Sequence, residues 1–202
     1  MTNESYNFEY LPQLVEEVPS YLTWHGGLSI KECKAIVKLF EDNETEKALI
    51  SNNEYNPEIR DTGIYWIPQT DENHWIYEKV IKLGKMINER FFHYDLVWEA
   101  RNNLMSILRY QEGQHFDWHL DKFETGLHPD GIRKLTLATQ INDPTEYEGG
   151  ECEVFHKYIP SEAPKEISMT SIFDSRMLHR VKPVTKGVRY SLIYWFIGPS
   201  WR

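Results

Sequence analysis

Two apolar patterns with helical spacing stand out in the first hundred residues. Ser29 and Glu32 have the spacing of a capping box, and apolar residues then recur every three or four positions as far as Phe40. A second apolar face with the same period runs through residues 70–91. Between these two patterns, residues 64–66 form a short apolar run that indicates a strand. We expect both helices to cover one face of a sheet.

After residue 100 the pattern changes to short apolar runs separated by turn-forming residues. Strands do not alternate with helices there, which disfavours a parallel α/β sheet. Short strands at this spacing predict a sandwich or barrel. The sequence therefore predicts one mainly β (α+β) domain over residues 1–202, with helical support over about 1–100 and a β core over about 101–202. The expected strands are Leu104–Tyr110, Gln114–Asp121, Arg133–Asn142, Glu151–His156, Glu166–Phe173, Met177–Val181 and Val188–Ile197.

The composition is that of an ordinary globular chain, with 41% hydrophobic and 26% charged residues. A formal net charge of −9 argues against binding to nucleic acid or to an anionic membrane, because both need a basic surface. Two cysteines, Cys33 and Cys152, are too few for a disulfide framework and fit a reducing compartment. Residues 1–20 lack the basic start and apolar stretch of a secretory signal, and no segment resembles a membrane span. We therefore expect a cytoplasmic protein.

One histidine and one aspartate in the expected strand 114–121 are the first candidates for chemistry. His119 and Asp121 are two residues apart, so on a strand their side chains point to the same face. His179, on a later expected strand, can supply a second imidazole. Two histidines and one carboxylate form the facial triad of non-haem iron(II) oxygenases, which leaves coordination positions open. The same ligand types also suit zinc or a structural metal, so that alternative stays open.

Arg189 and Tyr110 can complete such a site as a pocket for 2-oxoglutarate. This keto acid fills two coordination positions of the metal through its 1-carboxylate and 2-ketone, and dioxygen fills a third. Its far carboxylate then needs a fixed cation, and Arg189 follows His179 by ten residues. A guanidinium can hold a carboxylate through two parallel hydrogen bonds, and the phenol of Tyr110 can add another donor.

Three longer motifs carry a resemblance to a known family. They are Tyr110-x-x-Gly113-Gln114 before His119-x-Asp121, then Tyr147-Glu148-Gly149-Gly150-Glu151, and then His179-Arg180-Val181-x-Pro183-Val184-Thr185-x-Gly187-x-Arg189. In this order the segment 104–198 resembles the prolyl 4-hydroxylase-like branch of the 2-oxoglutarate/iron(II) oxygenases, which includes the PKHD-type hydroxylases. The resemblance implies a double-stranded β-helix, a distorted jelly roll, whose larger sheet is supported by helices.

The resemblance also assigns roles to the first five candidate residues. His119, Asp121 and His179 match the iron ligands of the family. Arg189 matches the basic residue that anchors the 5-carboxylate of 2-oxoglutarate, and Tyr110 matches a tyrosine that hydrogen-bonds the same group. An arginine in the anchoring position is typical of PKHD-type members, whereas collagen-type prolyl hydroxylases have lysine there.

Two further residues receive a role from the resemblance alone. Thr136 falls where relatives place a hydroxyl that contacts the co-substrate. Trp195 has the same strand parity as Arg189, six residues earlier, and falls where relatives place an aromatic residue that touches substrate; a place in the core is the alternative for it. Relatives often have an aromatic residue near the position of Gln140, so this chain departs from the family there.

The implied activity is hydroxylation of a substrate C–H bond by a dioxygenase that uses Fe(II), 2-oxoglutarate as co-substrate and O2, with ascorbate as an optional reductant. A prolyl or other side chain of a protein or peptide is the leading substrate, and a free amino acid or other small molecule is the alternative. The acidic chain and the spacing of its arginines disfavour DNA or RNA as substrate. A non-catalytic binding domain on the same scaffold is the rival from another class. The oligomeric state is left open.

Overall fold

The computed structural model describes residues 19–50, 54–98, 100, 103–122 and 131–201. Most of the N-terminal stretch considered above therefore lies outside the described residues. In chain order the elements are β1 (Tyr21–His25), α1 (Ile30–Glu41), β2 (Glu46–Lys47), β3 (Arg60–Asp61), β4 (Gly63–Trp66), α2 (His74–Ile87), the π-helical turn η1 (Asn88–Phe92), β5 (Ser106–Tyr110), β6 (His115–His119), β7 (Ile132–Gln140), the 3-10 turn η2 (Pro144–Glu146), β8 (Tyr147–Gly149), β9 (Cys152–His156), β10 (Ile159–Glu162), β11 (Met169–Asp174), β12 (His179–Val181), β13 (Val184–Gly187) and β14 (Arg189–Gly198).

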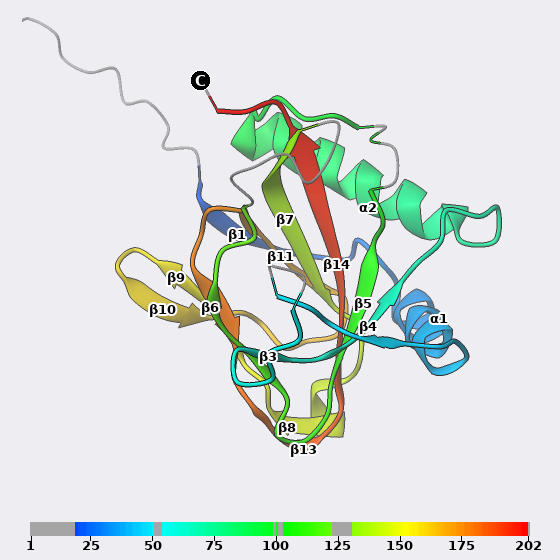
Figure 1. Cartoon of the computed structure of the whole chain (residues 1–202). Helices are drawn as coiled ribbons and strands as arrows, with labels where there is room; N and C mark the ends of the chain where they lie inside the picture. Colours follow the sequence, from blue (N-terminus) through cyan, green and yellow to red (C-terminus); the bar gives the residue numbers. More distant parts are fainter. Residues whose placement is uncertain (1–18, 51–53, 99, 101–102, 123–130, 202) are drawn as a thin grey trace, which may run out of the picture.

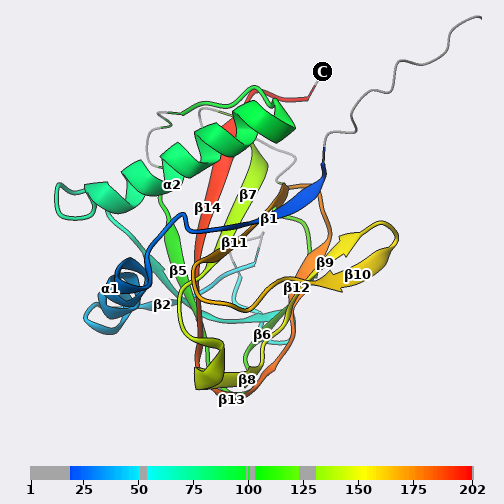
Figure 2. The same ribbon diagram turned by 180° about the vertical axis from the view of Figure 1, so that it is seen from behind.

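Two β-sheets form the body of the molecule (Figure 1). The larger sheet has seven strands in the order β1-β11-β7-β14-β5-β4-β2, and the smaller has five in the order β10-β9-β12-β6-β3. The short ladder of β13 with β8 lies at one end of the two sheets. Seen from behind, α1 and α2 lie across the larger sheet, on the side away from the smaller one (Figure 2). The expected double-stranded β-helix with supporting helices is confirmed.

Alternating residues of β14 separate a helix-covered core from a cavity between the sheets. The even-numbered residues from 190 to 196 belong to the core that α1 and α2 share with the sheet. The odd-numbered residues from 189 to 197 line the cavity. The central strand β7 repeats this alternation, as expected for side chains that project to opposite faces of a strand. On β7, the core residues are Leu135 and Leu137, and the cavity residues are Thr136 and Ala138.

Both expected helices are present. Ser29 caps α1, because its Oγ accepts a hydrogen bond from the Glu32 backbone N–H at 3.3 Å and its own N–H donates to the Glu32 carboxylate at 2.8 Å. The second expected helix divides into α2 and the π-helical turn η1. Among the described residues, no helix is long and apolar enough to cross a membrane.

The first hundred residues contribute more to the sheets than the helical pattern predicts. Only β4 was expected there, yet β1 extends the larger sheet along β11, β2 pairs with β4, and β3 pairs with β6. The strands β2 and β3 have two residues each, so neither can show an alternating pattern in the sequence. Contacts with distant strands, rather than local pattern, define them.

A substitution at Gly84 tests how α2 packs on the larger sheet. A methyl group at this position would overlap the ring of Phe196, which is almost fully buried on β14. We expect Gly84→Ala to lower the free energy of unfolding by about 1–3 kcal/mol, because overpacking outweighs the better helix propensity of alanine. Denaturant unfolding measures this. Lys85→Ala, at the exposed neighbouring position, is the control and should stay close to wild type. A Gly84→Ala protein as stable as wild type would contradict this packing.

Candidate metal and co-substrate site

Two imidazoles meet across the smaller sheet. His119 ends β6, His179 begins β12, and the two residues are register partners in the antiparallel pair. Their ring centroids lie 4.1 Å apart. The Nδ1 atoms of His119 and His179 lie 2.7 and 2.9 Å from the backbone carbonyl oxygens of Asp117 and Met177. Because a carbonyl oxygen can only accept, each Nδ1 carries the proton and each Nε2 presents a lone pair.

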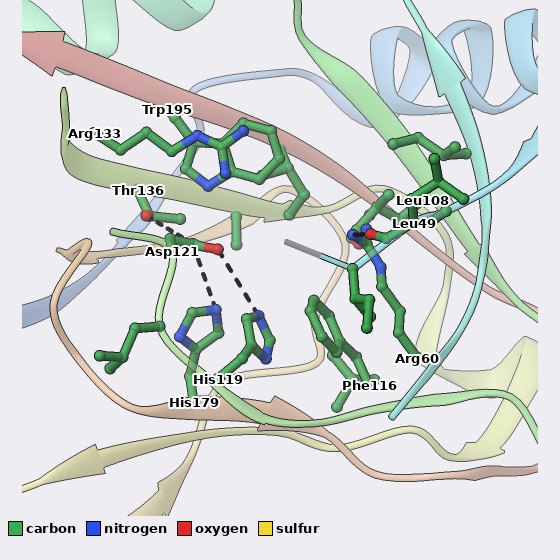
Figure 3. A pocket seen from close by; sticks show the side chains of 18 of the residues that line it. Leu49, Arg60, Leu108, Phe116, His119, Asp121, Arg133, Thr136, His179 and Trp195 are labelled. Atoms are coloured by element: carbon green, nitrogen blue, oxygen red, sulfur yellow. Dashed lines mark hydrogen bonds and ion pairs between the residues drawn. The ribbon is translucent and has the colours of Figure 1, made fainter. Parts of the chain in front are cut away.

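Asp121 supplies the carboxylate that faces both imidazoles. It lies two residues beyond the end of β6, so the expectation that it belongs to the strand is wrong, although its side chain reaches the expected face. Its Oδ1 is 3.8 Å from His119 Nε2, and its Oδ2 is 3.4 Å from His179 Nε2 (Figure 3). Ligand atoms of all three residues lie within 4.8 Å of one another. This donor set fits one divalent metal ion bound on three sides.

The protonation of His119 and Asp121 favours a bound cation. Burial, followed by the neighbouring His179, lowers the pKa of His119 to about 3, so its imidazole is neutral near pH 7. Burial acts to raise the pKa of Asp121, but the neighbouring imidazoles and Arg133 outweigh it and lower that pKa to about 2. A neutral imidazole and an ionised carboxylate are the forms that bind a metal ion.

Thr136 holds the carboxylate in place from β7. Its hydroxyl donates to Asp121 Oδ2 at 2.9 Å and lies 3.0 Å from the hydroxyl of Ser175. All three side chains are buried. In this structure Thr136 therefore orients a metal-site carboxylate, a contact that the sequence did not indicate. Ser175, fully buried behind Thr136, was not singled out from the sequence either.

Arg189 and Tyr110 lie opposite each other on neighbouring strands. They are register partners of β14 and β5, and the Arg189 guanidinium carbon lies 5.6 Å from the centroid of the Tyr110 ring. Arg189 is 7% exposed, and its Nη1 is buried without a hydrogen-bond partner among the described residues. Such an orphaned buried donor indicates a missing acceptor, because an unsatisfied polar group costs free energy. A carboxylate bound there would satisfy it.

Gly150, the second of two consecutive glycines, leaves the room that Arg189 needs. Gly149 and Gly150 have φ of +73° and +62°, a conformation that glycine adopts most readily. A Cβ at Gly150 would lie 2.9 Å from Val184 Cγ2 and 3.1 Å from Arg189 Cδ. A side chain at Gly150 would therefore crowd the arginine.

One cavity of about 770 Å³ connects these groups. All of the candidate site residues predicted from the sequence line it: His119, Asp121, His179, Arg189, Tyr110, Thr136 and Trp195. Gln140 is not among the lining residues and instead donates to the side chain of Asn142 at 3.0 Å. The structure thus brings together residues that are up to 85 positions apart in the chain, from Tyr110 to Trp195.

Three further cavity residues were not predicted. Phe116 stacks on His119 with ring centroids 3.4 Å apart. Arg60 lies over the other side of the Phe116 ring, and Arg133 lies over the ring of Trp195 with its guanidinium carbon 3.6 Å from the centroid (Figure 3). The alternation rule places Phe116 on the face opposite His119, but a register irregularity between His179 and Val181 breaks that rule. Arg60 and Arg133 have no motif in the sequence that marks them.

Comparison with known proteins agrees with this geometry. Residues 105–197 match the model of the 2OG-Fe(II) oxygenase superfamily. A PKHD-type hydroxylase of Cupriavidus metallidurans is 34% identical over 91 residues, which are 43% of this chain and 40% of that protein. A PKHD-type hydroxylase of Xylella fastidiosa is 34% identical over 94 residues, 43% of this chain and 41% of that protein. The chain thus spans about two fifths of the length of the curated relatives it matches.

Solved structures share the fold. A prolyl-4-hydroxylase of Pseudomonas putida superposes with a TM-score of 0.70 at 19% identity, covering 88% of this chain and 92% of that one. A prolyl hydroxylase of Trichoplax adhaerens, in complex with a peptide fragment of the hypoxia inducible factor oxygen degradation domain, gives a TM-score of 0.72 at 18% identity, covering 88% and 83%. Residues 105–197 are thus similar to the 2OG-Fe(II) oxygenase superfamily and to PKHD-type hydroxylases, and the solved prolyl hydroxylases share the fold.

Thr136 gives a test of how the carboxylate is oriented. Thr136→Val keeps the shape of the side chain but removes the hydrogen bond to Asp121. We expect the affinity for Fe(II) or Mn(II), measured by anaerobic calorimetry, to fall about 10–100-fold, the usual effect of losing a partner behind a metal ligand.

Thr139→Val is the matched control for this experiment. Thr139 is also buried on β7 and bonds to Thr170 at 2.8 Å, but it does not line the cavity. Its metal affinity should equal that of wild type. Equal metal affinity in the Thr136 variant would show that Asp121 needs no such support.

Proposed function

We propose that this chain is an Fe(II)- and 2-oxoglutarate-dependent dioxygenase that hydroxylates a C–H bond of its substrate. In this reaction one oxygen atom of O2 enters the keto acid, which leaves as succinate and CO2, and the other enters the substrate as a hydroxyl group. The observation that carries the proposal is a single cavity that combines the His119, Asp121 and His179 cluster with the buried Arg189, whose Nη1 has no hydrogen-bond partner among the described residues.

His119, Asp121 and His179 would hold the iron, which supplies the activation of dioxygen when it is bound. The chain keeps these ligands ready through the two backbone carbonyls on the imidazole Nδ1 atoms and the Thr136 hydroxyl on the carboxylate. Three protein ligands on one side leave the remaining positions for co-substrate and dioxygen. The protein's part is to orient these groups and to exclude water from them.

Arg189 would bind the 5-carboxylate of 2-oxoglutarate, with Tyr110 beside it. Burial makes this contact strong, because a charge-assisted pair is screened less in the interior than at the surface. Burial also raises the pKa of Tyr110 above its ordinary value, so its phenol stays protonated and can donate. Thr136 and Trp195, which line the same cavity, are proposed for the co-substrate and the substrate, as expected from the sequence.

A prolyl or other side chain of a protein or peptide is the proposed substrate, with a free amino acid or small molecule as the alternative. The likeness to PKHD-type hydroxylases and the peptide bound to the Trichoplax adhaerens structure support a peptide. The acidic net charge disfavours nucleic acid. The cytoplasmic location, the single-domain organisation and the optional use of ascorbate stay predictions.

Release of succinate from 2-oxoglutarate in the presence of Fe(II) and O2 tests the catalytic assignment directly. A slow uncoupled turnover without substrate is expected, and it should require iron. Purified protein that binds neither iron nor 2-oxoglutarate, and releases no succinate, would favour a non-catalytic binding domain instead.

His179→Ala should abolish iron binding and turnover, because it removes one of three ligand groups. Since the side chain is replaced at the edge of a cavity, we expect the far-ultraviolet circular dichroism spectrum to stay that of wild type. Anaerobic titration with Fe(II) measures the binding. His74→Ala, on the exposed start of α2, is the control and should bind iron normally. Wild-type iron affinity in the His179 variant would refute the metal assignment.

Arg189→Ala should weaken 2-oxoglutarate binding by about 2–5 kcal/mol, because the bound carboxylate would lose its buried partner. Iron binding should persist, since Arg189 contacts none of the three ligands. Titration of the Mn(II)-loaded protein with 2-oxoglutarate measures the change. Arg109→Ala is a matched control, because Arg109 precedes Tyr110 on β5 but packs on Phe40, outside the cavity. An unchanged 2-oxoglutarate affinity would rule out the anchoring role.

A further inference from the structure

Arg60 adds a third guanidinium to the cavity, beside those of Arg133 and Arg189, and interacts electrostatically with Tyr110 and Asp121. Arg60 begins β3, and its guanidinium carbon lies 4.5 Å from the centroid of the Phe116 ring. Phe116 in turn stacks on His119, with the ring planes 13° apart. Guanidinium, phenyl ring and imidazole therefore form one column that ends at a metal ligand (Figure 3). The Phe116 ring therefore separates Arg60 from His119, which would hold the metal.

The hydrogen-bonding capacity of Arg60 is only partly used. Its Nη1 donates to the backbone carbonyl of Leu49 at 3.0 Å, whereas its Nε is buried without a partner among the described residues. Burial lowers the pKa of Arg60 from its ordinary value, against the opposing influence of Tyr110 and Asp121. Within the described part of the chain, no carboxylate forms an ion pair with this arginine. A half-buried cation in this state gains from an anion that arrives with a ligand.

The charges of the loaded site leave Arg60 uncompensated. The two positive charges of iron(II) and that of Arg189 balance the one negative charge of Asp121 and the two of 2-oxoglutarate. Arg133, which interacts electrostatically with Asp121, and Arg60 then add two positive charges to this group of ions. Since a buried charge without a counter-ion is costly, the remaining ligand of this cavity should carry the negative charge.

The surroundings of Arg60 lie toward the open side of the cavity. Leu49 and Ile59, next to it, are 45% and 40% exposed, and Trp66 is 37% exposed, yet all three line the cavity. Arg189, in contrast, is 7% exposed. An incoming substrate meets Arg60 at this apolar rim, whereas the co-substrate carboxylate lies with the more deeply buried arginine.

We propose that Arg60 binds a carboxylate of the substrate, so that the molecules hydroxylated at this site are acids. This inference rests on the proposed function and names the substrate class for it. The carboxylate pairs with the Arg60 guanidinium, the apolar part of the substrate lies against Leu49, Ile59 and Trp66, and the reacting C–H group points past Phe116 to the metal. The acid group can be the α-carboxylate of a small molecule or the side chain of an acidic residue in a peptide.

Two pairs of compounds test the preference for an acid. They also distinguish the two possible sources of the carboxylate, a small molecule and a peptide side chain. N-acetyl-L-proline is compared with N-acetyl-L-prolinamide for a small acid, and acetyl-Pro-Asp-amide with acetyl-Pro-Asn-amide for an acidic peptide. Each is titrated into the full chain loaded with Mn(II) and N-oxalylglycine, which cannot turn over, and binding is followed by calorimetry. We expect the acid to bind about tenfold or more tightly than its amide in at least one pair, the usual size of a charge-assisted contact.

Arg60→Gln should reduce that preference to less than about threefold, because glutamine keeps a polar amide but carries no charge. Arg60→Lys keeps the charge and should retain part of the preference. Arg109→Gln is the matched control: its Nε is also buried without a partner among the described residues, and it also packs on an aromatic ring, but outside the cavity. It should leave the preference unchanged. If Arg60 only packed against Leu49 and Phe116, its replacement would leave the ratio of the acid and amide affinities unchanged.

The outcomes separate this inference from the proposed function. Equal binding of acid and amide in both pairs, or no binding of any of the four compounds, overturns the role of Arg60 even if 2-oxoglutarate is consumed. Weaker N-oxalylglycine binding in Arg60→Gln, as large as in Arg189→Ala, would make Arg60 a co-substrate residue and also overturn it. Failure of the wild type to bind 2-oxoglutarate contradicts the proposed function itself. If Arg60→Gln does not fold, the acid and amide affinities of the wild type and of Arg60→Lys decide whether Arg60 binds a substrate carboxylate.

Discussion

The antiparallel pairing of β6 with β12 is the contact on which the whole site depends. It places His119 opposite His179, and the register of two short strands decides whether these imidazoles meet. A shift of one residue would turn each side chain to the other face of the sheet. Two neighbouring strands limit such a shift, because β12 also pairs with β9 and β6 also pairs with β3. Arg60 and Asp61, which form β3, thus stabilise the register of the metal site, and Arg60 also lines the cavity.

Much of the site was predictable from the sequence because it follows from strand geometry and order. The spacing of His119 and Asp121 predicted that their side chains would meet, and they do, although Asp121 lies beyond the strand. The alternation along 188–197 likewise predicted that Arg189 and Trp195 share a face, and both line the cavity. These inferences needed only the two-residue repeat of a strand.

The residues that were missed lie where that local rule fails. Phe116 has the wrong parity for the face of His119, and its stacking on the imidazole depends on an irregular register that no local pattern reveals. Arg60 belongs to a two-residue strand in a polar stretch, and only its pairing with Phe116 defines it as a strand residue. Ser175 contributes through a contact with Thr136, 39 positions away. Contacts over such distances are properties of the folded sheet pair rather than of any segment.

The cavity is lined by several positive side chains, although the whole chain has a negative net charge. The protein carries a formal net charge of −9, yet Arg60, Arg133 and Arg189 all line the cavity. An acidic exterior repels long polyanions such as nucleic acids, whereas a positive interior favours a small or local negative charge that can leave the solvent. The reach of the exterior field is limited to about 8–10 Å at physiological salt, so a single carboxylate is not excluded by it. We therefore expect the substrate to be selected by its charge at the rim of the cavity, where Arg60 lies. This selection favours an acid over a neutral molecule of the same shape.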